Sequence, residues 1–152
     1  MGYTHYWKFN KGMKEDEAKK VLEEVKHLVS VLPEFSTTAG GYHTEDKIEL
    51  GDGWGEKEPI FNEDEILFNG KAYNGLDHEG FHVDFKNPTG DFCKTARKPY
   101  DMLVCLCLIS LKNNVKGFSF SSDGDLDDWK PAFEFYMEQG YKLKFDPDEC
   151  LD

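Results

Sequence analysis

The twelve residues from Tyr100 to Leu111 are almost wholly apolar and directly follow Pro99. Proline is favoured at the first position of a helix, so we expect a helix to begin here. A helix that is apolar on all sides must be surrounded by other elements of the fold. The run is shorter than the roughly 18 apolar residues of a membrane-spanning helix, and the chain has no longer one. The sequence therefore predicts a buried central helix and no membrane partner.

Two further stretches have the periodicity of amphipathic helices. Between Lys14 and Leu32 apolar residues recur every three or four positions, on one helical face: Ala18, Val21, Leu22, Val25, Leu28, Val29 and Leu32. Acidic residues fill its first turn, where the helix dipole favours them, and Pro33 ends it. A third helix is predicted from about Asp125 to Gln139, followed by Gly140 as a stop, with an apolar face made of Trp129, Phe133, Tyr136 and Met137.

Short segments rich in aromatic and β-forming residues, or with alternating polarity, predict strands at 4–9, 47–50, 65–68, 80–85, 118–121 and 141–145. Turn signals at Asn69-Gly70 and Asn74-Gly75 separate two of them. Strands and helices alternate irregularly, which is typical of the α+β class. We predict a single α+β domain over residues 1–152, with an antiparallel or mixed sheet covered by about three helices. Residues 33–64 are predicted to be a long, exposed acidic connection, and 146–152 an acidic tail.

The charge balance excludes several classes of function. The 152 residues include 18 Lys and Arg against 30 Asp and Glu, a formal charge of −12, so bulk nucleic acid and anionic lipid should be repelled. The N-terminus has neither a basic start nor an apolar stretch, so no secretory signal is expected. The four cysteines form no C-x-x-C pair, which disfavours a zinc ribbon or a thioredoxin-like site. We interpret them as small apolar residues of a reduced, cytoplasmic protein.

One basic segment stands out in this acidic chain. Residues 91–120 hold five basic and two acidic residues, and Arg97 is the only arginine. The arginine fork suits carboxylate or phosphate, and a helix start offers free N–H groups and a favourable dipole. We therefore predict a small-anion site made of Lys94, Thr95, Arg97 and Lys98, with stacking on a base or sugar by Tyr100, Trp7 and Tyr6 if these rings converge. The alternative is that Arg97 pairs with a carboxylate such as Asp101.

Two other patterns suggest metal sites but have simpler interpretations. His78-Glu79-Gly80-Phe81-His82 matches H-E-x-x-H, which binds zinc when it lies on a helix. Turn signals and strand alternation surround it here, and on a strand His78 and His82 would lie roughly 13 Å apart. The acids from Asp123 to Asp128 lack the full calcium-loop pattern, and N-capping of the third helix by Asp123 or Asp125 explains them. We predict no cofactor and no catalytic residues.

Several blocks of the chain resemble a family of small, uncharacterised phage and bacterial proteins. The most specific are Gly-Tyr-Thr-His-Tyr-Trp at 2–7 and Phe-Cys-Lys-Thr-Ala-Arg-Lys-Pro-Tyr-Asp at 92–101. Phe68-Asn69-Gly70, His78–Phe81 and Ser121–Gly124 with Trp129 add to the resemblance, which does not extend to His82. The resemblance implies a phage or prophage origin and brings no activity with it.

Three hypotheses about function follow. The first is a non-enzymatic phage protein that acts against host defence by sequestering a nucleotide-derived signal, with Arg97, Lys94 and Lys98 on its phosphates. The second is an acidic protein that imitates nucleic acid and blocks a host defence protein. The third is a zinc-dependent hydrolase that uses His78, Glu79 and His82.

Overall fold

The computed structural model describes residues 2–36 and 46–151. It contains three α-helices: α1 (Glu15–Ser30), α2 (Asp101–Asn114) and α3 (Leu126–Glu138). Two short 3-10 helices are η2 (Ala72–Asn74) and η3 (Pro147–Glu149). All three predicted α-helices are confirmed, and α2 is buried along nearly its whole length. α1 ends two residues before the predicted end because a residue that precedes proline, here Leu32, is disfavoured in helical conformation.

The strands form two antiparallel sheets. In the first, β1 (Thr4–Phe9) lies between β6 (Asp91–Lys94) and β7 (Phe118–Ser122). In the second, β4 (Glu65–Gly70) pairs with β5 (Phe81–Asp84), β2 (Leu50–Gly51) and β3 (Ile60–Phe61). The predicted α+β class with antiparallel strands and three helices is confirmed, although the strands divide into two sheets.

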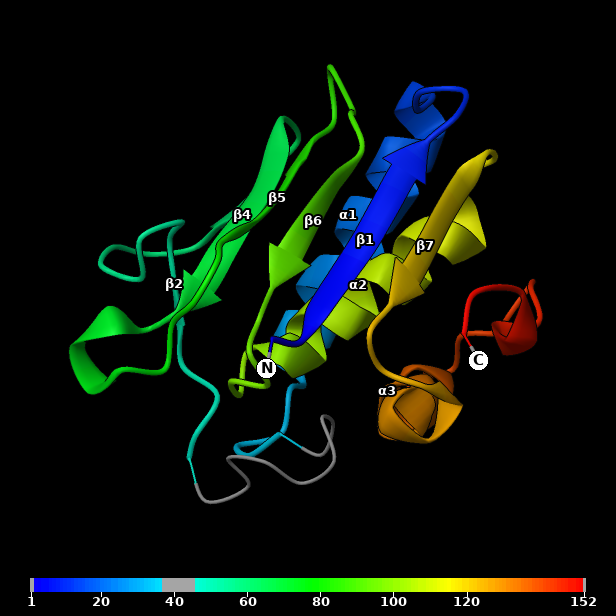
Figure 1. Cartoon of the computed structure of the whole chain (residues 1–152). Coiled ribbons are helices and arrows are strands. Elements are labelled where there is room, and N and C mark those ends of the chain that lie inside the picture. Colours follow the sequence, from blue (N-terminus) through cyan, green and yellow to red (C-terminus); the bar gives the residue numbers. More distant parts are fainter. Residues whose placement is uncertain (1, 37–45, 152) are drawn as a thin grey trace.

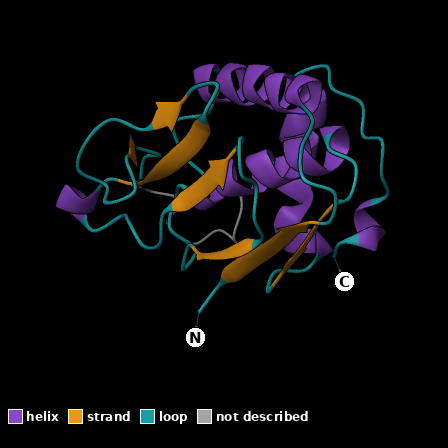
Figure 2. Ribbon diagram, turned by 90° about the horizontal axis from the view of Figure 1, so that it is seen from above, coloured by secondary structure: helices purple, strands orange, loops and turns teal. Residues whose placement is uncertain are grey.

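The helices lie on one side of the first sheet. α1 and α2 run behind β6, β1 and β7 in Figure 1, and the view from above separates the helices from these strands (Figures 1 and 2). Alternate residues of β1, such as His5 and Trp7, are buried on the helix side, whereas Tyr6 and Lys8 are exposed on the opposite face. In residues 2–36 and 46–151 no helix has the length and hydrophobicity needed to cross a bilayer.

The predicted connection over 33–64 is more structured than expected. Its described part contributes β2 and β3 to the second sheet, and Phe61 packs on Phe68 of β4. Phe35 and Lys47 also form an isolated bridge. Gly40 and Gly41, which helped to define the connection, lie outside the described residues. Antiparallel pairing with β4, which the polarity of the local sequence does not predict, orders residues 50–51 and 60–61.

The predicted strand at 141–145 is wrong. The carboxamide of Asn113 on α2 donates to Lys142 O (2.9 Å) and accepts from Lys144 N (2.6 Å). These two bonds to a side chain hold the segment in place. They do not make it a strand, because no strand of the described residues pairs with its backbone. Within the predicted acidic tail, residues 147–149 form η3 and Leu151 is buried.

Candidate functional site

The predicted basic segment forms the connection between β6 and α2. We call residues 94–98 the basic turn. The backbone N–H groups of Thr95 and Ala96 donate to Tyr3 O at 3.0 and 3.2 Å, which ties the turn to the chain just before β1. Lys98 N–H then donates to Thr95 O at 3.0 Å and closes the turn. Bonds to the chain just before β1 and within the turn itself therefore hold it in place between β6 and α2.

The centre of the basic turn is strained. Ala96 and Arg97 have φ values of 51° and 60°, in the left-handed region that side-chain-bearing residues rarely adopt. Each such residue costs of order 1–3 kcal/mol and persists only where its surroundings impose it. Neither position is glycine, so two residues that carry side chains are held in a backbone conformation that disfavours side chains. Strain of this kind concentrates at functional positions.

Arg97 lies across the ring of Tyr3. Its Cζ is 4.0 Å from the ring centroid, a cation–π arrangement. Its Nη1 lies 3.8 Å from Asp128 Oδ1 on α3, and the Arg97 side chain retains 29% of its exposure. The alternative prediction was that Arg97 pairs with a carboxylate. The structure contains such an ion pair, and its carboxylate is that of Asp128. Burial raises the pKa of the Tyr3 hydroxyl, and the positive charge of Arg97 opposes the rise.

The structure divides the predicted anion-site residues into two groups. Lys94, Arg97, Lys98 and Tyr6 retain exposed surface. Thr95, Tyr100 and Trp7 are buried and engaged: Thr95 Oγ1 donates to Asp101, Tyr100 Oη donates to Glu79 O, and the Trp7 ring packs on Phe81. A ligand that binds the turn as it stands meets only the first group.

The start of α2 does not supply free donors. The N–H groups of Asp101, Met102 and Leu103 donate to the carbonyls of Lys98, Pro99 and Tyr100 respectively. The expectation of free N–H groups at this helix start is wrong, because a tight first turn satisfies them internally. An anion near the turn would depend on side chains.

Directly beneath the turn lies a buried polar cluster that the sequence analysis missed. His5 Nε2 and Thr95 Oγ1 each lie 2.6 Å from Asp101 Oδ1, and Cys105 Sγ lies 3.6 Å from Asp101 Oδ2. His5 and Asp101 are fully buried. The two are 96 residues apart, so no local signal pairs them.

Hydrogen-bond directions in this cluster follow from counting donors. Ser122 Oγ accepts from Gly124 N–H at 2.9 Å and from the Trp129 indole N–H at 3.1 Å, which occupies both lone pairs. Its own proton is therefore donated to His5 Nδ1, 2.8 Å away. His5 Nε2 then carries the ring proton and donates it to Asp101. The cluster is a neutral histidine that links β7 to a buried carboxylate at the start of α2.

Among the described residues, His5, Asp101 and Cys105 are the one group of three potential metal ligands whose donor atoms converge, within 4.8 Å of one another. A metal on His5 Nε2 would need the ring proton on Nδ1, facing a Ser122 oxygen that already accepts two hydrogen bonds. We therefore interpret the cluster as a structural network that supports the basic turn through Thr95.

The H-E-x-x-H motif is extended, as its context predicted. His78 lies in the irregular segment before β5, and His82 on β5 pairs with Glu65 at 2.9 Å. Glu79 Oε1 accepts Lys94 N–H at 2.6 Å, so the motif's glutamate links β6 to the segment before β5. The capping interpretation of the acids near α3 is confirmed, because Asp125 accepts Asp128 N–H at 3.0 Å.

Three of the four cysteines are buried and all four are free. Burial raises the pKa of the Cys93, Cys105 and Cys107 thiols well above the ordinary range, which keeps them protonated at pH 8. We expect Ellman's reagent to titrate at most one thiol of the native protein at pH 8, Cys150, and four in guanidinium chloride. Cys150→Ser should remove the native reaction. Rapid labelling of two or more thiols in the folded protein would contradict this prediction.

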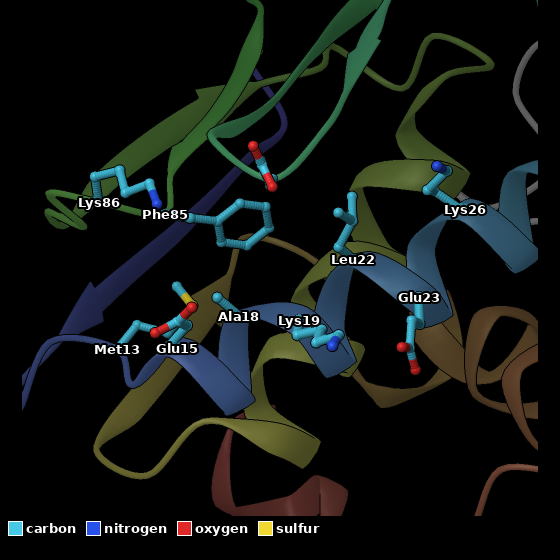
Figure 3. A pocket seen from close by; sticks show the side chains of 10 residues that line it. Met13, Glu15, Ala18, Lys19, Leu22, Glu23, Lys26, Phe85 and Lys86 are labelled. Atoms are coloured by element: carbon cyan, nitrogen blue, oxygen red, sulfur yellow. The ribbon is translucent and has the colours of Figure 1, made fainter.

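A cleft of about 610 Å³ lies apart from the basic turn, between α1 and the end of β5 (Figure 3). Its apolar side chains include Leu22 and Phe85. Three lysines and three glutamates surround them: Lys19, Lys26, Lys86, Glu15, Glu23 and Glu63. Because these positive and negative charges are equal in number, the cleft does not favour the binding of an anionic ligand.

Comparison of the chain with protein-family models, with curated proteins and with solved structures found no match.

Proposed function

We propose that this protein is a non-enzymatic binding protein for a small anionic ligand, which Lys94, Arg97 and Lys98 of the basic turn hold. The observation that carries the proposal is the strained Ala96–Arg97 pair, which presents the only arginine of the chain at the surface. Guanidinium binds phosphate and carboxylate through two parallel hydrogen bonds, which lysine does not reproduce.

The ion pair of Arg97 with Asp128 is weak. The 3.8 Å separation from Asp128 is longer than the roughly 2.7–2.9 Å of a strong charge-assisted hydrogen bond. An ion pair at this distance between partly exposed groups contributes only about 0–1 kcal/mol. A bidentate anion can therefore replace the contact with Asp128, while Tyr3 continues to support the guanidinium.

The wider setting is part of the proposal. The resemblance at residues 2–7 and 92–101 implies a phage origin. We propose that the anionic ligand is a nucleotide-derived signal of host defence, which the protein sequesters. The free cysteines support a reducing compartment, which would be the cytoplasm of the host.

Isothermal titration calorimetry with pyrophosphate and with ADP tests the proposal. We expect Arg97→Ala to weaken binding at least about tenfold, consistent with the loss of a charge-assisted hydrogen bond. Arg97→Lys should recover only part of it, because lysine keeps the charge and loses the fork. The matched control is Lys86→Ala, which removes a surface cation from the cleft and should bind as the unsubstituted protein does.

Three results would overturn the proposal: no binding of either anion, binding unchanged by Arg97→Ala, or loss of binding in Lys86→Ala alone. The last would place the site in the cleft. Circular dichroism and unfolding midpoints of each variant separate a lost contact from a lost fold.

A specific observation favours the acidic inhibitor as a second candidate. Residues 121–152 carry ten acids and three lysines, and Asp125 and Asp127 at the start of α3 are exposed. This surface suits a partner that otherwise binds nucleic acid. Capture of a nucleic-acid-binding host protein that weakens with salt and survives Arg97→Ala would favour this function over the first.

A further inference from the structure

The open face of the first sheet carries an exposed aromatic pair beside the basic turn. Tyr6 of β1 lies directly opposite Phe92 of β6 in the antiparallel register. Their exposures are 43% and 55%, high for large aromatic residues. Directly opposite residues have Cβ atoms about 4.5–5.5 Å apart, so these two exposed side chains are neighbours on the face.

The same face carries two lysines and, at one end, one aspartate. Lys8 and Lys94 project from it together with Ser119 and Ser121, on the side away from the helices. Asp123, at one end, already accepts from Thr4 N at 3.0 Å and from Tyr6 Oη at 3.4 Å. Its contact with Tyr6 helps to orient the ring without covering it.

The aromatic pair and the turn are within reach of one small ligand. Phe92 and Lys94 are two residues apart on β6, which places their Cα atoms about 6.6 Å apart on the same face. Lys94 also begins the turn that presents Arg97. A ligand with its anionic group on Lys94 can therefore extend over Phe92 and Tyr6. Arg97 contacts Tyr3 and Asp128 on the helix side, so the same ligand meets it around the end of the sheet.

We infer that the ligand of the basic turn is a nucleotide, whose base stacks on Tyr6 and Phe92 while its phosphates bind Lys94 and Arg97. This inference rests on the proposed function and adds the aromatic part of the ligand. A flat ring suits the pair because aromatic side chains stack on any nucleobase. Long nucleic acid is disfavoured by the charge of −12, which leaves a single nucleotide as the occupant.

Calorimetry with ADP, pyrophosphate and ribose 5-phosphate tests the inference. We expect ADP to bind the unsubstituted protein roughly tenfold more tightly than either base-free probe, the gain expected from one stacked base. Phe92→Ala should remove this preference and leave pyrophosphate binding unchanged, and Phe92→Tyr should retain it. Trp54→Ala, which removes an exposed aromatic outside this sheet, is the matched control and should keep the preference.

The experiment distinguishes failure of the base-stacking inference from failure of the proposed function. Equal affinity for ADP and the base-free probes, or a preference that survives Phe92→Ala, overturns the base-stacking inference and leaves the anion site standing. Absence of binding by all three probes overturns the proposed function and the inference with it.

Discussion

Asp101→Ala is expected to lower the free energy of unfolding by about 3–5 kcal/mol, because it leaves several buried hydrogen-bond donors without an acceptor. The substitution removes the acceptor of three buried donors: His5 Nε2–H, the Thr95 hydroxyl and the Cys105 thiol. Each unsatisfied buried donor costs about 1–3 kcal/mol, and the cluster is sealed from water. Thr95 also loses its tie to α2, so the basic turn should loosen.

Urea denaturation, followed by circular dichroism, measures this effect. Asp16→Ala is the matched control, because Asp16 is also an acid in the first turn of a helix but is exposed. It should lose only a dipole interaction of about 0.3–1 kcal/mol. Asp101→Asn keeps one acceptor oxygen, so its loss in the free energy of unfolding should lie between the losses of Asp101→Ala and Asp16→Ala. If Asp101→Ala lost less than about 1 kcal/mol, the comparison with Asp16→Ala would show that the cluster does not stabilise the fold.

Gly70→Ala is the second large effect that we expect. A Cβ at Gly70, the last residue of β4, would lie 1.8 Å from Leu76 O and 2.7 Å from Leu76 C. These are backbone atoms that no side-chain rotation moves, so β4 and the segment at Leu76 would have to separate. We expect a loss of about 3 kcal/mol, at the upper end of the usual cost of overpacking.

Gly53→Ala provides the control, measured in the same urea titration. Its Cβ would meet Leu67 Cδ1 at 3.3 Å, the end of a flexible side chain that can move by a few tenths of an ångström. We expect a change below about 1 kcal/mol. Equal stability of Gly70→Ala and Gly53→Ala would mean that the close approach of Leu76 to β4 is not maintained in solution.

Gly70 also shows where turn signals mislead. Asn69-Gly70 predicts a hairpin turn, yet both residues belong to β4. The Asn69 carboxamide donates to Gly53 O and His78 O and accepts from His78 N, so it joins segments on both sides of the strand. The chain turns later, at η2, where Gly75 has a φ of 75°. Asparagine and glycine serve close backbone packing as well as tight turns, and the dipeptide alone does not distinguish the two.

The helices were predictable because their signals are local. The spacing of apolar residues identifies α1 and α3, the apolar run after Pro99 identifies α2, and proline and aspartate mark their limits. The basic segment was also visible, since Arg97 is unique in the sequence. The contacts of Arg97 with Tyr3 and Asp128 could not be predicted, because both residues lie far from Arg97 in the sequence.

The sequence by itself determined the helices, the α+β class and the isolation of one arginine in an acidic chain, because periodicity, capping and charge act between near neighbours. The tertiary structure alone decided which residues stay available to a ligand. Strand register buries Trp7 and exposes Tyr6 beside Phe92, and the pairing of His5 with Asp101 draws Thr95 into the core. Such contacts join residues some 90 positions apart. They form only when the helices cover one face of the sheet and leave the other open.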